Sequence, residues 1–132
     1  MTPVAPFECR LDDPGADAAF RAFVEALCGE SASRRYAILA HHAGTGPRCL
    51  LESSGRCLPA DTPWRMARAM VEPLLRFDDT VEWVALFPID DWKARGDRAM
   101  ADAMAAGESW TRRLSRELAD ELPRVPRLIV RR

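Results

Sequence analysis

The sequence predicts a single α+β domain over residues 1–132, built on a mostly antiparallel sheet. Three observations lead to this fold class. A chain of 132 residues has the length of one domain, since domains run to roughly 100–200 residues. An apolar content of 48% with 30% charged residues excludes disordered and fibrous proteins. Runs with the alternation of strands and runs with the periodicity of helices follow one another along the chain.

The first two elements are predicted to be a strand over residues 4–11 and a helix that begins at Asp13 and Pro14. Asp13 is a good capping residue, and proline suits the first helical position. Gly29 is expected to end the helix. The apolar residues between these limits recur with the spacing of a helix that buries one face, and they are Phe20, Phe23, Val24, Leu27 and Cys28.

Residues 36–58 are expected to form short strands joined by tight turns. Tyr36 to His42 is an apolar run typical of a strand, residues 43–47 indicate a hairpin turn, and residues 49–51 and 56–58 indicate two further strands. A strand, and not a helix, follows the glycines at 44 and 46, which argues against a phosphate-binding loop.

The next helix is predicted to start at Asp61 or Thr62, with Pro63 in its first turn. Pro73 is expected to kink this helix or to end it, because the proline ring clashes with the preceding turn. The inner face of the helix is predicted to consist of Trp64, Ala67, Val71 and Leu74 or Leu75.

The remaining elements are predicted to be a buried strand, a long helical stretch and a terminal strand. Residues 80–89 are apolar on both alternations, with Val81, Trp83, Ala85 and Phe87 on one side and Val84 and Leu86 on the other. This pattern predicts a strand covered on both faces, or on one face with a partner on the other. Residues 91–122 keep helical phase across Gly107, as one bent helix or two shorter ones. Residues 128–130 form a last strand, which Pro126 favours at a sheet edge.

The order β-α-β-β-α-β over residues 4–89 resembles the split β-α-β arrangement of ferredoxin-like domains. The resemblance implies two helices on one face of an antiparallel sheet, followed here by the long helix and the edge strand. A different α+β sheet made from the same elements is the alternative. Fold order alone does not determine function in either case.

Charge and cysteine content restrict the expected partners and compartment. A formal net charge of −1 gives no bulk attraction to nucleic acid or to a membrane surface. We find no secretory pattern and no run of the roughly 18 apolar residues that a membrane helix needs. The cysteines are therefore expected to be reduced thiols in a cytoplasmic protein. No cofactor is expected.

His42, Cys49 and Cys57, with His41 beside them, are weak candidates for a metal site, since zinc binds nitrogen and thiolate ligands. Their spacing matches no familiar zinc module, and adjacent strand residues point to opposite faces. Cys49 could also form a nucleophilic pair with a histidine. The preferred interpretation is structural, with no metal bound.

The charged residues are unevenly distributed along the chain. Residues 112–132 contain seven arginines and three acidic residues, which indicates a solvated, ion-paired face. Residues 78–91 contain only acidic charges, on Asp78, Asp79, Glu82, Asp90 and Asp91. Asp90 and Asp91 with Lys93 are similar to a metal-dependent nuclease site, but two aspartates before a helix are also what capping favours.

Two tryptophans suggest that the acidic segment binds a partner protein. Trp64 and Trp92 each fall in the first turn of a helix, where side chains reach the rim of a domain. Buried aromatic anchors dominate the energetics of many protein interfaces. The sequence therefore predicts a partner-binding surface made of Asp78, Asp79, Asp90, Asp91, Trp92 and Trp64.

Our leading functional hypothesis is a small, non-enzymatic, bacterial protein-binding module. An inhibitor, immunity protein or antitoxin that neutralises a cognate toxin fits the size and the acidic segment, because acidic groups attract a basic partner. One alternative is a ligand-sensing or homo-oligomeric regulatory domain, with a homodimer as its form. Another is a small enzyme that depends on a Cys/His pair or on carboxylates.

Overall fold

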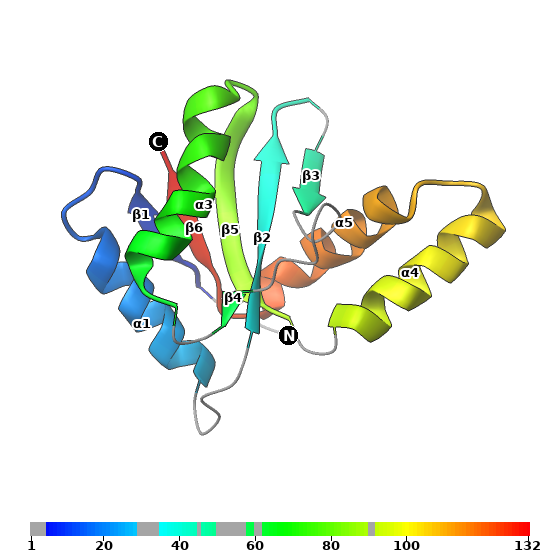
Figure 1. Cartoon of the computed structure of the whole chain (residues 1–132), viewed down its shortest axis with the longest axis horizontal. Coiled ribbons are helices and arrows are strands. Elements are labelled where there is room, and N and C mark those ends of the chain that lie inside the picture. The colour runs from blue at the N-terminus through cyan, green and yellow to red at the C-terminus, as the bar shows by residue number, and fades with distance from the viewer. Residues whose placement is uncertain (1–4, 29–34, 45, 50–57, 60–61, 90–91) are drawn as a thin grey trace.

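A mixed sheet forms the middle layer of the computed structural model, and helices cover both of its faces (Figure 1). The structure describes residues 5–28, 35–44, 46–49, 58–59, 62–89 and 92–132. Its strands are β1 (Phe7–Arg10), β2 (Arg35–His42), β3 (Gly46–Cys49), β4 (Leu58–Pro59), β5 (Val81–Pro88) and β6 (Leu128–Arg131). Its helices are α1 (Ala16–Cys28), α3 (Trp64–Phe77), α4 (Trp92–Ala106), α5 (Trp110–Glu121) and the 3₁₀ turn η1 (Leu122–Arg124). The α+β class predicted from the sequence is confirmed.

The strand order is β1-β6-β5-β2-β3, with β4 also paired to β2. Only the β1–β6 pair is parallel among the described strands, so the sheet is mostly antiparallel as predicted. The predicted edge position of the last strand is wrong, because β6 lies between β5 and β1. Pro126 precedes β6 and takes no place in its ladder, so it does not restrict where the strand inserts.

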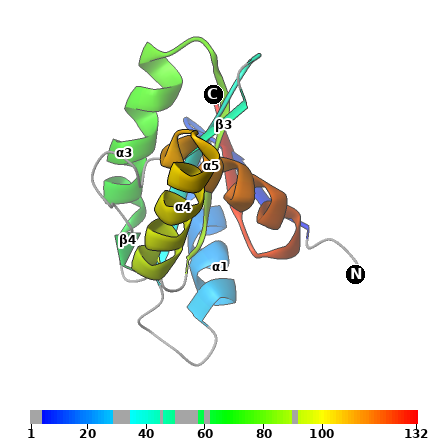
Figure 2. The ribbon, with the colours of Figure 1, turned by 90° about the vertical axis from the view of Figure 1, so that its right-hand side faces the viewer.

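The ferredoxin-like order is not confirmed. The first strand pairs with the last strand and not with any strand of residues 35–89. Helices also cover both faces of the sheet: α1 and α3 pack on one face, and α5 packs on the other (Figure 1). Helix α4 packs against α5 (Figure 2).

The central strands β2 and β5 are buried on both faces. Tyr36, Ile38 and Ala40 of β2 face α1 and α3, whereas the alternate residues Ala37 and Leu39 face α5. In β5, the side chains of residues 84 and 86 join the first layer and those of residues 85 and 87 join the second. The coverage of this strand on both faces is therefore confirmed for residues 84–87, whereas Thr80 and Glu82 are exposed.

A bulge in β5 changes one part of the predicted alternation. His41 pairs with Trp83, but the next residue, His42, pairs with Val81, so Glu82 is an extra residue in the ladder. Val81 therefore packs on the same face as Val84 and not on the face of Trp83. Strict alternation from the sequence placed Val81 on the wrong side because one inserted residue reverses every assignment beyond it.

The structure corrects the predicted boundaries of one helix and decides between the two alternatives that the sequence left open for residues 91–122. Helix α3 starts at Trp64 with Pro63 at the N-cap position, and Thr62 provides no side-chain cap. The helix also continues through Pro73 to Phe77. Ala69 and Pro73 are both exposed, so water can reach the Ala69 carbonyl that loses its helical partner at Pro73. The 91–122 stretch forms two helices, since Gly107 adopts φ +70° after α4.

None of the helices in the described parts of the chain is both long enough and apolar enough to cross a bilayer.

Arg132 connects the end of α3 to the start of β5. Its guanidinium donates to the backbone carbonyl oxygens of Leu75 at 2.5 Å, Asp78 at 2.8 Å and Val81 at 2.6 Å. The Leu75 carbonyl belongs to the last turn of α3, where no further helical amide follows to bond it. One side chain thus donates hydrogen bonds to carbonyls at the end of a helix, in a turn and at the start of a strand.

We expect Arg132→Met to lower the free energy of unfolding by about 1–3 kcal/mol, because it removes a donor from three carbonyls, of which that of Asp78 keeps the Val81 amide as its donor at 3.1 Å. Arg131→Met is the matched control, since Arg131 is half exposed and the ion pair found for it among the described residues, to Glu8, spans 3.7 Å. We expect the control to change stability by less than about 0.5 kcal/mol. Chemical denaturation measures both, and equal losses would contradict the assigned role of Arg132.

Candidate protein-binding surface

The predicted acidic surface is not brought together in the described part of the structure. Asp78 and Asp79 precede β5, whereas Pro88 and Ile89 lie at its far end, before Asp90. The eight residues of β5 span about 27 Å at roughly 3.4 Å per residue. Asp90 and Asp91 fall outside the described residues, as does the side chain of Trp92 at the start of α4. Asp78 and Asp79 therefore lie a strand's length from the start of α4.

Trp64 is a core residue. Its side chain is 9% exposed and packs on Phe20, with ring centroids 5.4 Å apart. It also lies at the N-terminal end of α3, and Asp78 follows the C-terminal end of this 14-residue helix. That separation is about 21 Å at 1.5 Å per residue. Because Trp64 is buried, it adds little to any contact surface that includes the two aspartates.

Asp78 belongs to a small polar cluster with Thr80 and His42. Its Oδ1 accepts hydrogen bonds from the Thr80 amide at 3.0 Å and from the Thr80 hydroxyl at 2.6 Å. Because the hydroxyl proton is used in this way, the Thr80 oxygen accepts from His42 Nδ1 at 3.0 Å, which assigns a proton to Nδ1. The bonds from Thr80, and then the charges of His42 and Arg132, hold the pKa of Asp78 below its ordinary range. Asp79 is exposed.

The predicted metal ligands are not gathered by the described residues. The ring of His41 stacks on Trp83 on the α5 side of the sheet, whereas His42 bonds Thr80 at the end of β5. Cys49 of β3 lies opposite Leu39 of β2. The side chain of Cys49 and the whole of Cys57 fall outside the described residues. No cluster of three or more potential ligands occurs among the residues described. Cys9 is buried, and burial raises the pKa of its thiol to about 11, so it is an unreactive core residue.

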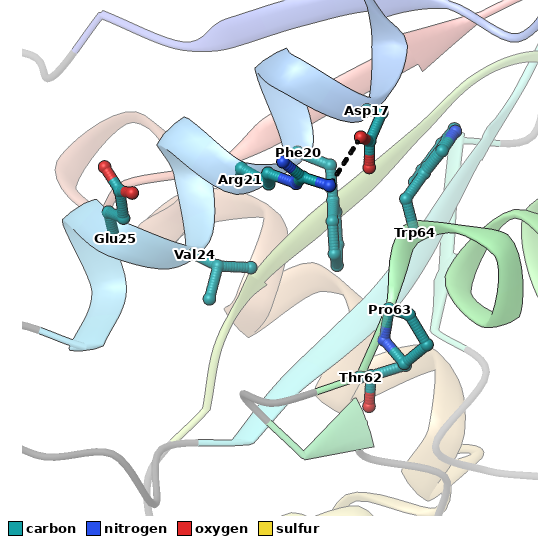
Figure 3. Close-up of a pocket in the computed structure, with 8 residues that line it drawn as sticks. All are labelled: Asp17, Phe20, Arg21, Val24, Glu25, Thr62, Pro63 and Trp64. Carbon is teal, nitrogen blue, oxygen red and sulfur yellow. Dashed lines mark ion pairs between the residues drawn. The ribbon is translucent and has the colours of Figure 1, made fainter.

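A pocket of about 280 Å³ lies between α1 and the start of α3 (Figure 3). Phe20 and Trp64 contribute aromatic surface to it, and Val24 contributes aliphatic surface. Asp17 and Arg21 at its rim form an ion pair of 3.0 Å. Its full lining is Asp17, Phe20, Arg21, Val24, Glu25, Thr62, Pro63 and Trp64.

Helix α3 carries a second apolar face that points away from the sheet. Met66, Met70, Pro73 and Phe77 follow one another at intervals of four, three and four residues, which places them in one row on a helix. Phe77 is 86% exposed and Met66 is 55% exposed. We call these four residues the α3 apolar face. The buried residues of α3, which are Trp64, Ala67, Val71 and Leu75, lie on the opposite side.

Ion pairs on a third side of α3 fix its orientation. Glu72 bonds Arg68 at 3.1 Å and Arg76 at 2.8 Å, and Asp12 of the β1–α1 turn bonds the same two arginines at 3.0 and 2.9 Å. The four side chains form a closed ring of alternating charge. Because the core holds one side and this ring holds another, Met66, Pro73 and Phe77 of the α3 apolar face are left exposed, whereas Met70 is half-buried and packs against the edge of the core.

Sequence reasoning missed the α3 apolar face, although its signal is present. The apolar residues of α3 form two rows at helical spacing. The sequence prediction assigns the row that ends at Leu75 to the core and gives no role to the other. A helix with two such rows has apolar surface that one core cannot bury. The exposed row is the feature that the sequence prediction of this helix lacked.

We expect the Asp78 carboxylate to stabilise the fold in a pH-dependent way. A carboxyl whose pKa is lowered on folding stabilises above its ordinary pKa, and the effect is lost as pH falls from that ordinary value through the lower pKa of the folded state. Unfolding midpoints of the wild type and of Asp78→Asn should therefore differ at neutral pH and converge on acidification.

Asp79→Asn is the control for this measurement, because Asp79 is exposed and adjacent in sequence. Its pH profile should run parallel to that of the wild type. A gap between wild type and Asp78→Asn that is the same at every pH would contradict the assignment.

Comparisons with protein-family models, with curated proteins and with solved structures found no match for this chain.

Proposed function

We propose that this chain is a non-enzymatic protein-binding module that contacts its partner through the α3 apolar face. The observation that carries the proposal is the exposure of Phe77 and Met66, at 86% and 55%, in one row on one helix. Large exposed apolar patches mark interaction sites on folded proteins. Burying a single side chain of this kind gains about 1.5–3 kcal/mol, and methionine adapts to varied partner surfaces.

The rigidity of α3 supports the same proposal. The helix is already folded and is held by the core and by the ring of Asp12, Arg68, Glu72 and Arg76. A partner therefore binds a preformed surface, and association does not require the entropic cost of ordering this helix.

The inhibitor hypothesis is the form of this proposal that charge favours. Asp79 is exposed and lies two residues after Phe77, so a basic partner would meet a carboxylate beside an aromatic anchor. An immunity protein or an antitoxin that neutralises a toxin would use such a surface. A cytoplasmic location, predicted from the cysteine content, belongs to the same proposal.

A photo-crosslinking amino acid placed at position 77 tests the proposal in cells that contain the natural partner. We expect adducts with protein from position 77 and from position 66. Position 104 on α4 is the matched control, because Met104 is also an exposed apolar residue, at 77%, but lies on another helix. Adduct formation no greater at 77 than at 104 would overturn the proposal.

The pocket between α1 and α3 supports a second candidate function, the sensing of a small ligand. Its aromatic wall of Phe20 and Trp64 suits an apolar ring, and Glu25 offers a carboxylate at the rim while Arg21 is paired with Asp17. The chemistry that fits is a small aromatic amine.

Phenethylamine is a suitable probe for this pocket. We expect it to raise the unfolding temperature of the wild type and to bind at least about tenfold more weakly to Val24→Trp, whose side chain fills the pocket. Asp79→Asn, at the other end of α3, should bind like the wild type. Equal shifts for all three proteins would exclude ligand binding at this site.

A further inference from the structure

We infer that the partner of the α3 apolar face is a second copy of this chain, packed antiparallel across a twofold axis at the middle of α3. This inference rests on the proposed function, and it replaces the inhibitor form of that proposal, because it names a second copy, and not a toxin, as the partner of the same surface. Three properties of α3 lead to it: the spacing of its exposed apolar residues, their sizes, and the charges at its two ends.

The α3 apolar face is symmetric about the peptide bond between Val71 and Glu72. Met66 and Phe77 lie at equal distances on either side of this point, and so do Met70 and Pro73. When two such helices run antiparallel across a twofold axis at that point, Met66 faces Phe77 of the second copy and Met70 faces Pro73. Each apolar residue of one copy then meets an apolar residue of the other.

The sizes of these residues suit a close helix crossing. The residues of the row nearest its middle are Met70, which is half-buried and packs against the core, and Pro73, which has a short side chain, whereas Met66 and Phe77 stand at the ends. Short side chains at the crossing point let two helix axes approach to about 8–10 Å. The long end residues can then reach across to the neighbouring helix.

The charges at the two ends of α3 are opposite and unneutralised within the described structure. Arg65 is exposed near the N-terminal end and Asp79 is exposed just beyond the C-terminal end, and no ion pair is found for either among the described residues. Antiparallel pairing brings Arg65 to the level of the Asp78–Asp79 turn of the second copy, at both ends of the contact. Parallel pairing would bring Arg65 beside Arg65. The charges therefore favour the antiparallel dimer.

The contact between two α3 helices is small. Helix α3 has 14 residues and is about 21 Å long, so one helix pair buries less than the roughly 800 Å² per partner of a standard interface. We therefore expect a reversible dimer with a dissociation constant in the micromolar range. The monomer has a mass of 14.8 kDa, so dimerisation is easily resolved by sedimentation.

Sedimentation velocity over a concentration series tests the dimer. We expect the wild type to shift from monomer to dimer, and Phe77→Glu to raise the dissociation constant by at least about tenfold. Met104→Glu is the control for adding a charge at an exposed apolar site and should dimerise like the wild type. A wild type that stays monomeric, or a Phe77→Glu variant that dimerises normally, overturns the inference.

Charge reversal tests the antiparallel register independently. Arg65→Glu and Asp79→Arg should each weaken the dimer by about twofold to fivefold, as expected for exposed charges. The double variant restores opposite charges at both ends and should recover most of the affinity. Both residues are exposed, so the variants keep the core, and an unchanged unfolding midpoint confirms this. Failure of the double variant to recover would contradict the register.

Crosslinking at position 77 separates this inference from the proposed function. An adduct of twice the chain mass supports the dimer. Adducts only with a different protein, together with a monomeric wild type, overturn the dimer and leave the protein-binding function standing. A monomeric wild type without any adduct overturns both.

Discussion

The arrangement of this protein depends on the antiparallel pairing of β2 and β5 in the middle of the sheet. Tyr36 to Ala40 and Val84 to Phe87 are all buried, on both faces of the two strands. Two strands covered on both faces require apolar residues at every position, and they require a helical layer on each side. The placement of α1 and α3 on one face, and of α5 on the other, follows from that requirement.

The same requirement explains why α3 retains an unburied apolar row. The sheet accepts one side of the helix, and the ring of Asp12 with Arg68, Glu72 and Arg76 occupies a second. A helix of this kind needs only one apolar stripe to fold onto its sheet. Met66 and Phe77 of the α3 apolar face take no part in the core, and they are therefore the part of α3 for which an external contact is the simplest explanation.

The sequence predicted local structure well and long-range placement poorly. The phase of Phe20 and Phe23 in α1, and the double coverage of β5, follow from periodicities that a short window contains. The neighbours of β6 and the extra residue Glu82 depend on hydrogen bonds between distant segments, which no local periodicity reports. Acidic residues that are close in sequence were likewise predicted to be close in space, but an extended strand separates Asp79 from Ile89.

The parallel pairing of β1 with β6 joins segments about 120 residues apart, from Phe7 to Leu128. β1 has no other strand partner in the described sheet, and β6 is the last of these strands to leave the ribosome. During synthesis, β1 with its apolar residues Phe7 and Cys9 must therefore wait without a strand partner until residues 128–131 have emerged, although Phe20 and Phe23 of α1 can already pack on Tyr36. Non-local pairing of this kind slows folding, because loop closure precedes the contacts that compensate for it. The nascent chain thus passes through a stage in which this apolar surface is a natural substrate for chaperones.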